Sequence, residues 1–341
     1  MGTLAEMLST PLGVIEWFVY LLAAVMFVIG LHLMNSPKTA RKGNMVSAIG
    51  MVFAVAMAFI VLFAGEASNG FKHGVAVIVL IVGIVIGAVA GVVSAKKVKM
   101  TDMPQLVSVF NTVGGGAAAL VALNDILTSA ETPSIVVLIT AGLGIMIGSV
   151  TFSGSLIAAG KLQGIKWVKK LSLPGKGFWN ILFVVLTIVS FVMLCVQPNQ
   201  RLLWSILTTV FALCYGLVFV IPIGGADMPV VISVLNACTG TAVAMSGLAI
   251  NNIALIVAGA LVGAAGVTLS IAMSKAMNRP LLSVLAGGFG GSNSAAGAGE
   301  GLEGTMKETS ADDLAVQLVY AEKVIFVPGF GLAQAQAQRE L

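Results

Sequence analysis

The chain has little charge: only 9% of its 341 residues are Asp, Glu, Lys or Arg, whereas 58% are hydrophobic. Soluble domains carry about 25% charged residues, so the composition excludes an ordinary soluble protein. The basic residues stand between apolar runs and form no basic face. A net charge of +4 distributed in this way argues against nucleic acid as a partner.

Cysteine is scarce as well. The three cysteines, Cys195, Cys214 and Cys238, lie inside apolar segments and show no CxxC or metal-ligand spacing. We therefore expect small apolar residues that face lipid or another helix, and we expect no metal site. The only two histidines, His32 and His73, lie near the ends of apolar segments, where an interfacial side chain is the simpler interpretation.

Long apolar runs are what the chain has in abundance. A bilayer core of about 30 Å needs about 20 apolar residues per helix, and nine segments meet this requirement. Lipid offers no hydrogen-bond partner to a free backbone amide, so each segment is expected to be helical. The fold class predicted is an all-α polytopic membrane protein with nine transmembrane helices, over residues 13–34, 46–65, 73–95, 103–124, 134–160, 178–196, 202–223, 228–250 and 253–277.

The positive charges predict how the spans are oriented. When successive loops are assigned alternately to the two sides, one side collects thirteen Lys and Arg residues, from Lys38 to Arg279. The other side has only Lys72 and Arg201. We therefore expect the N-terminus outside and the C-terminal segment in the cytoplasm, which requires an odd number of spans.

The fourth and eighth predicted spans are similar in sequence. Asp102-Met103-Pro104 returns 125 residues later as Asp227-Met228-Pro229. A weaker similarity links the two helices that follow, so the sequence predicts a parallel repeat, with spans 4–5 repeated as spans 8–9. The positions shared further along the two helices are Ser108 and Ser233, Val109 and Val234, Asn111 and Asn236, Gly115 and Gly240, Ala117 and Ala242, and Ala119 and Ala244.

The repeated residues predict one polar face on each helix. Asp can cap a helix or interact with its positive end, and Pro fits the first turn. Ser, Asn and Gly then follow at intervals of three or four residues, which places them on one side. Each face has an acid at its cytoplasmic mouth, a hydroxyl one turn in and an amide near mid-membrane: Asp102, Ser108 and Asn111 in the first copy, Asp227, Ser233 and Asn236 in the second.

Two interpretations of these faces stay open. Small residues and amides allow transmembrane helices to pack closely, whereas buried polar groups in membranes are often functional and would here form a track for protons or another ion. The paired occurrence favours function for Asn111 and Asn236. None of the 14 carboxylates lies at the middle of a predicted span, so the expected path consists of amides, hydroxyls and water.

The character of the sequence changes after the last predicted span. Residues 1–280 are predicted to be the transmembrane domain and residues 281–309 a linker, which is rich in Gly, Ser and Ala from Gly287 onwards. Residues 310–341 are predicted to start another domain.

This last segment is expected to open with a short amphipathic helix over residues 311–320, capped by Ser310. A strand over residues 324–327, a turn with Gly329 and Gly331, and a helical stretch over 332–338 follow. Strand, GxG turn and helix are typical of the first β-α unit of a Rossmann-like domain, although the pattern alone is weakly specific.

These features together resemble the beta subunit of proton-translocating NAD(P) transhydrogenases, over nearly the whole chain. The resemblance implies that the complete beta subunit binds NADP(H) in its C-terminal domain and that a partner alpha subunit binds NAD(H). It also implies that the membrane domain couples hydride transfer to proton translocation, in a dimer of alpha-beta units within the lipid bilayer of the inner membrane. The most specific segments are residues 96–104, 224–231, 275–279, 286–290, 328–331 and 335–338.

The resemblance also assigns roles to single residues. Asp227 and Asn236 match the family's cytoplasmic acid and membrane asparagine, and Ser155 matches a serine associated with the proton path. With Ser108, Asn111 and Ser233 from the repeat, these are the proton-path candidates. The coupling candidates are Asp102, the packing glycine Gly266, and the basic residues Lys275 and Arg279, whereas Gly329 and Gly331 match the start of the NADP(H) fingerprint.

Two departures from the family pattern matter. Asn111 stands where some members have a proton-path histidine, so the titrating group is expected on a partner helix or in water. We expect the nucleotide domain to be incomplete here, from truncation or from a split protein, and therefore do not expect this chain alone to transfer hydride. The alternative function is a secondary transporter or ion channel without redox chemistry, for which the strand-GxG-helix segment has no use.

Overall fold

The computed structural model describes residues 10–64, 70–99, 102–129, 133–165, 168, 175–278, 280–288 and 311–327. It has two compact units, Met1–Ser292 and Asn293–Leu341, which are described separately.

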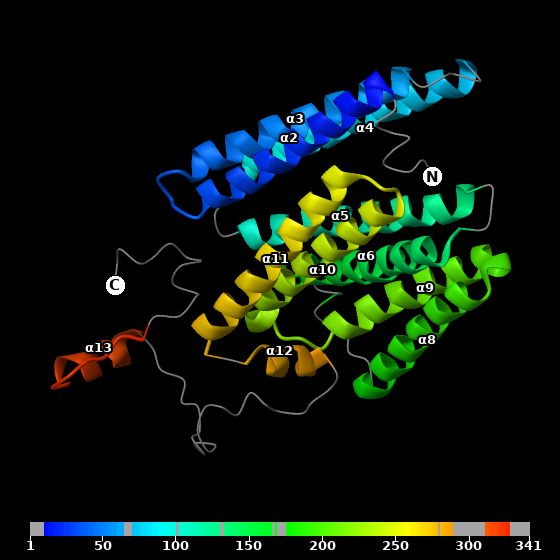
Figure 1. Cartoon of the computed structure of the whole chain (residues 1–341). Coiled ribbons are helices and arrows are strands. Elements are labelled where there is room, and N and C mark those ends of the chain that lie inside the picture. Colours follow the sequence, from blue (N-terminus) through cyan, green and yellow to red (C-terminus); the bar gives the residue numbers. More distant parts are fainter. Residues whose placement is uncertain are drawn as a thin grey trace. The chain divides into compact units, whose positions relative to one another are not determined.

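Nine helices within the described part of the first unit are long and apolar enough to cross a membrane, as predicted. Each predicted span falls on one of them (Figure 1). Two short 3-10 turns, η2 (Pro198–Gln200) and η3 (Gly225–Asp227), precede α9 and α10. The nine are α2 (Pro11–Met34), α3 (Ala40–Ala64), α4 (Gly70–Lys97), α5 (Met103–Thr128), α6 (Ile135–Leu162), α8 (Lys176–Val196), α9 (Arg201–Val220), α10 (Met228–Ala249) and α11 (Ile253–Ala276).

Local sequence explains where several helices begin. The side chains of Thr10, Ser134 and Asn252 accept hydrogen bonds from backbone N–H groups in the first turns of α2, α6 and α11. These bonds satisfy donors that have no partner inside a helix. In α5 and α10 a proline occupies the first turn instead, as the Asp-x-Pro pattern predicts.

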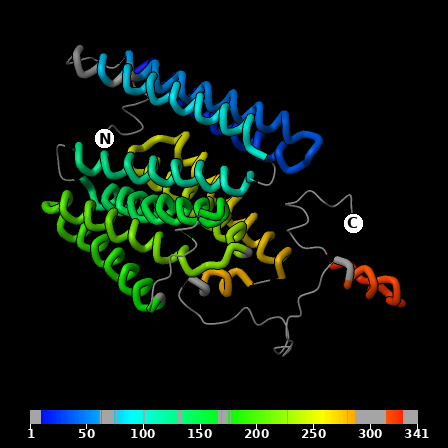
Figure 2. The backbone as a smooth tube through the Cα atoms, turned by 180° about the vertical axis from the view of Figure 1, so that it is seen from behind, coloured from blue at the N-terminus to red at the C-terminus, as the bar shows by residue number. Residues whose placement is uncertain are grey.

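Helices α5 and α6 pack as one pair and α10 and α11 as another, and α10 also packs against α5 and α6 (Figures 1 and 2). Helix α9 packs between α6 and α8, and α2 contacts α3 and α11. None of the described side chains of α4 is buried. Two packed pairs are what a parallel repeat would give, but pairing alone does not establish a repeat. The repeat therefore stays a prediction.

Glycine allows the closest helix crossings. A Cβ built on Gly148 of α6 would lie 2.7 Å from the carbonyl oxygen of Gly115 on α5. A Cβ on Gly259 of α11 would lie equally close to the carbonyl oxygen of Gly240 on α10. Real Cβ atoms do not approach backbone oxygens so closely, so these glycines are required for packing.

Two buried clusters close the ends of the bundle. One lies where α6, α9 and α11 end and α10 begins, and it contains Ile157, Val220, Ile223, Met228 and Leu235. The other lies at the opposite end. We call the first the basic end, because α4, α6 and α11 have Lys96, Lys97, Lys161 and Lys275 in their last turns there.

The first unit extends beyond residue 280. Residues Leu281–Gly288 form a further helix, α12, in the segment predicted to be linker. Val284 of α12 is only 2% exposed and belongs to the cluster at the basic end. Residues 289–309, the rest of the predicted linker, lie outside the described residues.

In the second unit the predicted helix is present and the predicted strand is not. Helix α13 covers Ala311–Val319, close to the expected 311–320. Residues 324–327 have no regular secondary structure, and their side chains are exposed. A strand needs a neighbour for its backbone hydrogen bonds, and none of the described residues supplies one. Ser310, Gly329, Gly331 and the helix expected over 332–338 lie outside the described residues.

Candidate functional site

Three of the predicted proton-path residues meet between α5 and α6. The Asn111 amide donates to the Ser155 hydroxyl at 2.8 Å, and the Ser108 hydroxyl donates to the Ser155 carbonyl oxygen, also at 2.8 Å. One helical turn on, Thr112 donates to the carbonyl oxygen of Ser108. All four side chains are buried. The repeat placed Ser108 and Asn111 on one face, and the fold brings Ser155 to that face.

Some buried polar atoms in the same region lack a partner. The side-chain oxygens of Asn111, Ser149 and Thr239 are inaccessible and form no hydrogen bond. A buried polar atom without a partner costs about 1–3 kcal/mol. Thr239 belongs to α10, and its methyl group would lie 3.3 Å from a Cβ built on Gly114 of α5. Unpaired oxygens therefore occur on α5, α6 and α10, the three helices that pack on one another.

A second polar seam joins α10 to α11. The hydroxyls of Ser233 and Ser270 lie 3.0 Å apart, and both reach the carbonyl oxygen of Gly266, at 3.2 and 2.7 Å. A Cβ on Gly266 would lie 2.6 Å from the backbone nitrogen of Ala237. The packing glycine and Ser233 thus belong to one contact, directly beside Asn236.

Asn236 itself is not brought to Asn111 by a hydrogen bond. It is half-buried on α10, and its amide forms no hydrogen bond within the described part of the chain. Helices α10 and α5 are joined instead by Ser246 of α10, whose hydroxyl donates to the carbonyl oxygen of Ala118 on α5 at 3.0 Å.

The two predicted acids occupy equivalent positions at helix starts. Asp102 and Asp227 directly precede α5 and α10, and neither side chain makes a capping hydrogen bond. Asp102 is exposed and Asp227 half-buried. Of the two roles that the pattern allowed, capping by hydrogen bond is absent and a place at the positive helix end remains.

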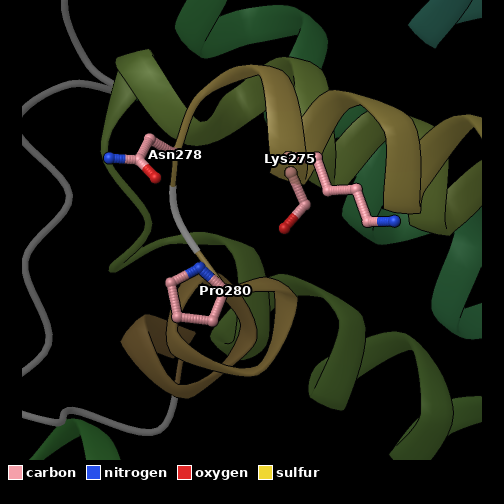
Figure 3. A pocket seen from close by; sticks show the side chains of 4 residues that line it. Lys275, Asn278 and Pro280 are labelled. Atoms are coloured by element: carbon pink, nitrogen blue, oxygen red, sulfur yellow. The ribbon is translucent and has the colours of Figure 1, made fainter.

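Lys275 borders an open pocket of about 280 Å³ at the end of α11. Ser274, Asn278 and Pro280 line the rest of it, and Figure 3 shows Lys275 and Asn278 on opposite sides. Asn278 has a φ of 51°, which ends the helix in the left-handed conformation that Asn tolerates. Arg279 lies outside the described residues.

Several polar residues of these seams were missed at the level of sequence. Thr239, Ser149 and Ser246 carry no motif, and their role appears only once neighbouring helices are placed. Ser270 had a signal, because it recurs in the weaker similarity between the helices after the two copies. Lys161 was counted only as a positive charge.

The described residues do not form a nicotinamide nucleotide site. Residues 311–327 comprise one helix and an exposed stretch, without a strand or a phosphate-binding turn. They do not fit NADP(H) by themselves. Among the described residues, no three His, Cys, Asp or Glu side chains gather in a way that could hold a metal ion.

Comparison with known proteins identifies the family to which the sequence belongs. Residues 16–341 match the family model of the NAD(P) transhydrogenase beta subunit. NAD(P) transhydrogenase subunit beta of Rhodospirillum rubrum is 40% identical over 331 residues, which cover 94% of this chain and 68% of that relative. A strain of the same species has a subunit with the same identity and coverage. The chain therefore belongs to the family of NAD(P) transhydrogenase beta subunits.

Proposed function

We propose that this chain couples hydride transfer between NAD(H) and NADP(H) to the movement of protons through the seam between α5 and α6. The observation that carries the proposal is the buried Asn111 amide, which is bonded to Ser155 on one side and has an unpaired oxygen on the other. A polar group buried inside a membrane bundle costs free energy, and groups that are kept there despite this cost typically serve a function.

Asn111 does not titrate, so it acts by holding water. An amide both donates and accepts hydrogen bonds, and its free oxygen can accept one from a water molecule. Ser108 and Ser155 extend the polar surface along the helix pair. Protons then move along water that these side chains order, and a titrating group on a partner subunit or in the water carries the charge.

Helix α10 is suited to control this path. It packs against α5, α6 and α11, and it carries Asp227 at its start, then Ser233 and Asn236. A shift of α10 would change both polar seams at once. The coupling candidates Asp102 and Lys275 lie at helix ends on the predicted cytoplasmic side, where nucleotide binding is expected to act. Arg279, the other basic coupling candidate, lies outside the described residues.

The nucleotide and partner assignments are part of the proposal. Gly329 and Gly331 belong to the NADP(H) site of the complete beta subunit, NAD(H) binds an alpha subunit, and the enzyme is a dimer of such pairs. The protein lies in the inner membrane, with its N-terminus outside and its C-terminal segment in the cytoplasm. The alternative, a transporter or channel without redox chemistry, is not favoured, because family and relatives are transhydrogenase subunits.

The test uses the complete enzyme, assembled from full-length beta subunit and alpha subunit, in liposomes. Asn111→Leu and Asn236→Leu are compared with Thr268→Val, whose exposed hydroxyl bonds only within its own helix. The asparagine variants are expected to lose at least tenfold in proton uptake per unit time, while Thr268→Val keeps it. Normal proton uptake coupled to hydride transfer in Asn111→Leu would refute the proposed path.

A further inference from the structure

The side chain of Lys161 makes an unusual contact at the basic end of the bundle. Its ammonium group, on the last turn of α6, donates to the carbonyl oxygens of Val220 at 3.3 Å, of Ile223 at 2.8 Å, and of Ile221. An ammonium has three N–H donors. One half-buried cation thus binds three carbonyl oxygens at the end of another helix.

These oxygens need such a partner. Helix α9 ends at Val220, and the last carbonyls of a helix lack intrahelical donors and carry its negative dipole end. No backbone N–H among the described residues bonds to the carbonyls of Ile221 or Ile223, and both residues are buried. Without Lys161, two buried carbonyl groups would lack their hydrogen bonds.

The contact joins α6, which carries Ser155, to the turn that leads to α10. Lys161 follows Ser155 on α6 by six residues. The turn that it binds leads directly to Asp227 and α10 through Gly224 and Gly225. Both glycines are exposed, and a Cβ on either would meet nothing within 4 Å, whereas Ile223 before them and Met228 after them are buried.

We propose that Lys161 is a positioning residue for the coupled reaction: it fixes the turn between α9 and α10 on α6 and thereby sets the position of Asp227 and α10 relative to Ser155. The inference rests on the proposed function. Without the ammonium group the turn is no longer held on α6. Helix α10 then loses the position relative to Ser155 that links proton movement to hydride transfer.

The test measures the number of protons moved per hydride transferred, in liposomes that contain the complete enzyme. Proton uptake is followed with an enclosed pH dye, and hydride transfer with an NAD analogue whose reduced form absorbs at a different wavelength from NADPH. Lys161→Met is expected to lower the ratio about tenfold. Lys161→Arg keeps a cation and several donors, and is expected to restore at least half of it.

The matched control is Lys97→Met, which removes an exposed positive charge from the end of α4 and should leave the ratio unchanged. An unchanged ratio in Lys161→Met, or an equal loss in Lys161→Arg and Lys161→Met, would overturn the inference. If Lys161→Met does not assemble, Lys161→Gln is measured under the same criterion. Failure of the wild-type enzyme to couple at all would instead refute the proposed function.

Discussion

At the residue scale, hydrogen-bond partners distinguish two kinds of polar residue that the sequence alone could not distinguish. Most hydroxyls in the spans, such as those of Thr151 and Thr187, donate to the carbonyl four residues earlier in their own helix. This bond satisfies a hydroxyl in lipid without any function. Asn111 and Ser108 bond to a different helix instead, and Ser246 bonds both to its own helix and to α5. These interhelical bonds single out the residues for which we propose the second interpretation, a polar track.

Ser155→Ala tests the track at this scale. The change removes the acceptor of the buried Asn111 amide, and an unsatisfied buried donor costs about 1–3 kcal/mol. We expect a lower thermal midpoint of the complete enzyme in detergent and a proton-coupled rate reduced about tenfold. Thr268→Ala provides the control, because it removes a hydroxyl from the exposed face of α11. Equal behaviour of the two variants would contradict the role of Ser155.

At the element scale, glycine contacts fix how α10 and α11 cross. In Gly266→Ala the new methyl group would lie 2.6 Å from the backbone nitrogen of Ala237, so the helices must separate. Overpacking of this kind costs about 1–3 kcal/mol. We expect a lower unfolding midpoint together with weaker coupling, since Asn236 precedes the displaced residue.

Gly83→Ala is the matched control for this change. Gly83 lies in α4, and an added Cβ would meet nothing within 4 Å. Alanine also favours the helix by up to about 1 kcal/mol relative to glycine. Thermal unfolding of both variants in detergent should therefore give opposite or clearly different shifts, and a similar destabilisation would argue against the crossing described.

Helix α12 gives a further prediction for the element that follows the last span. Val284→Ala removes two methyl groups from the cluster at the basic end and is expected to cost about 1–2 kcal/mol. Leu282→Ala, on a residue 80% exposed, should have no measurable effect. If neither change shifts the midpoint of thermal unfolding, α12 does not pack on the bundle and belongs to the linker, as the sequence predicted.

The sequence predicted elements well and contacts poorly, for physical reasons. Long apolar runs define helices because lipid leaves the backbone no other solution, and Asp-x-Pro marked the starts of α5 and α10. The predicted strand over residues 324–327 is absent, because a short apolar segment forms a strand only beside a neighbouring strand. Lys161 was missed because its acceptors lie some sixty residues further along the chain, and no spacing rule connects them.

At the scale of the whole molecule, the nine candidate spans among the described residues are expected to alternate and to place their loops on two sides of the membrane. The structure agrees with the alternation, since α6, α9 and α11 end in the region where α10 begins. The charge distribution adds a direction: the side with most Lys and Arg is expected to be cytoplasmic. The last residues of α4 and the residues of η2 are then predicted to be accessible from opposite sides of the membrane.

Cysteine labelling tests this direction in intact cells. Lys97→Cys, at the end of α4, and Asn199→Cys, in η2, both place a thiol at an exposed position. A membrane-impermeant maleimide applied from outside should label Asn199→Cys at once and Lys97→Cys only after permeabilisation. The unsubstituted chain, whose three cysteines are half-buried within spans, supplies the background. The reverse pattern would invert the orientation, and labelling of both from one side would mean that the spans between them do not alternate as described.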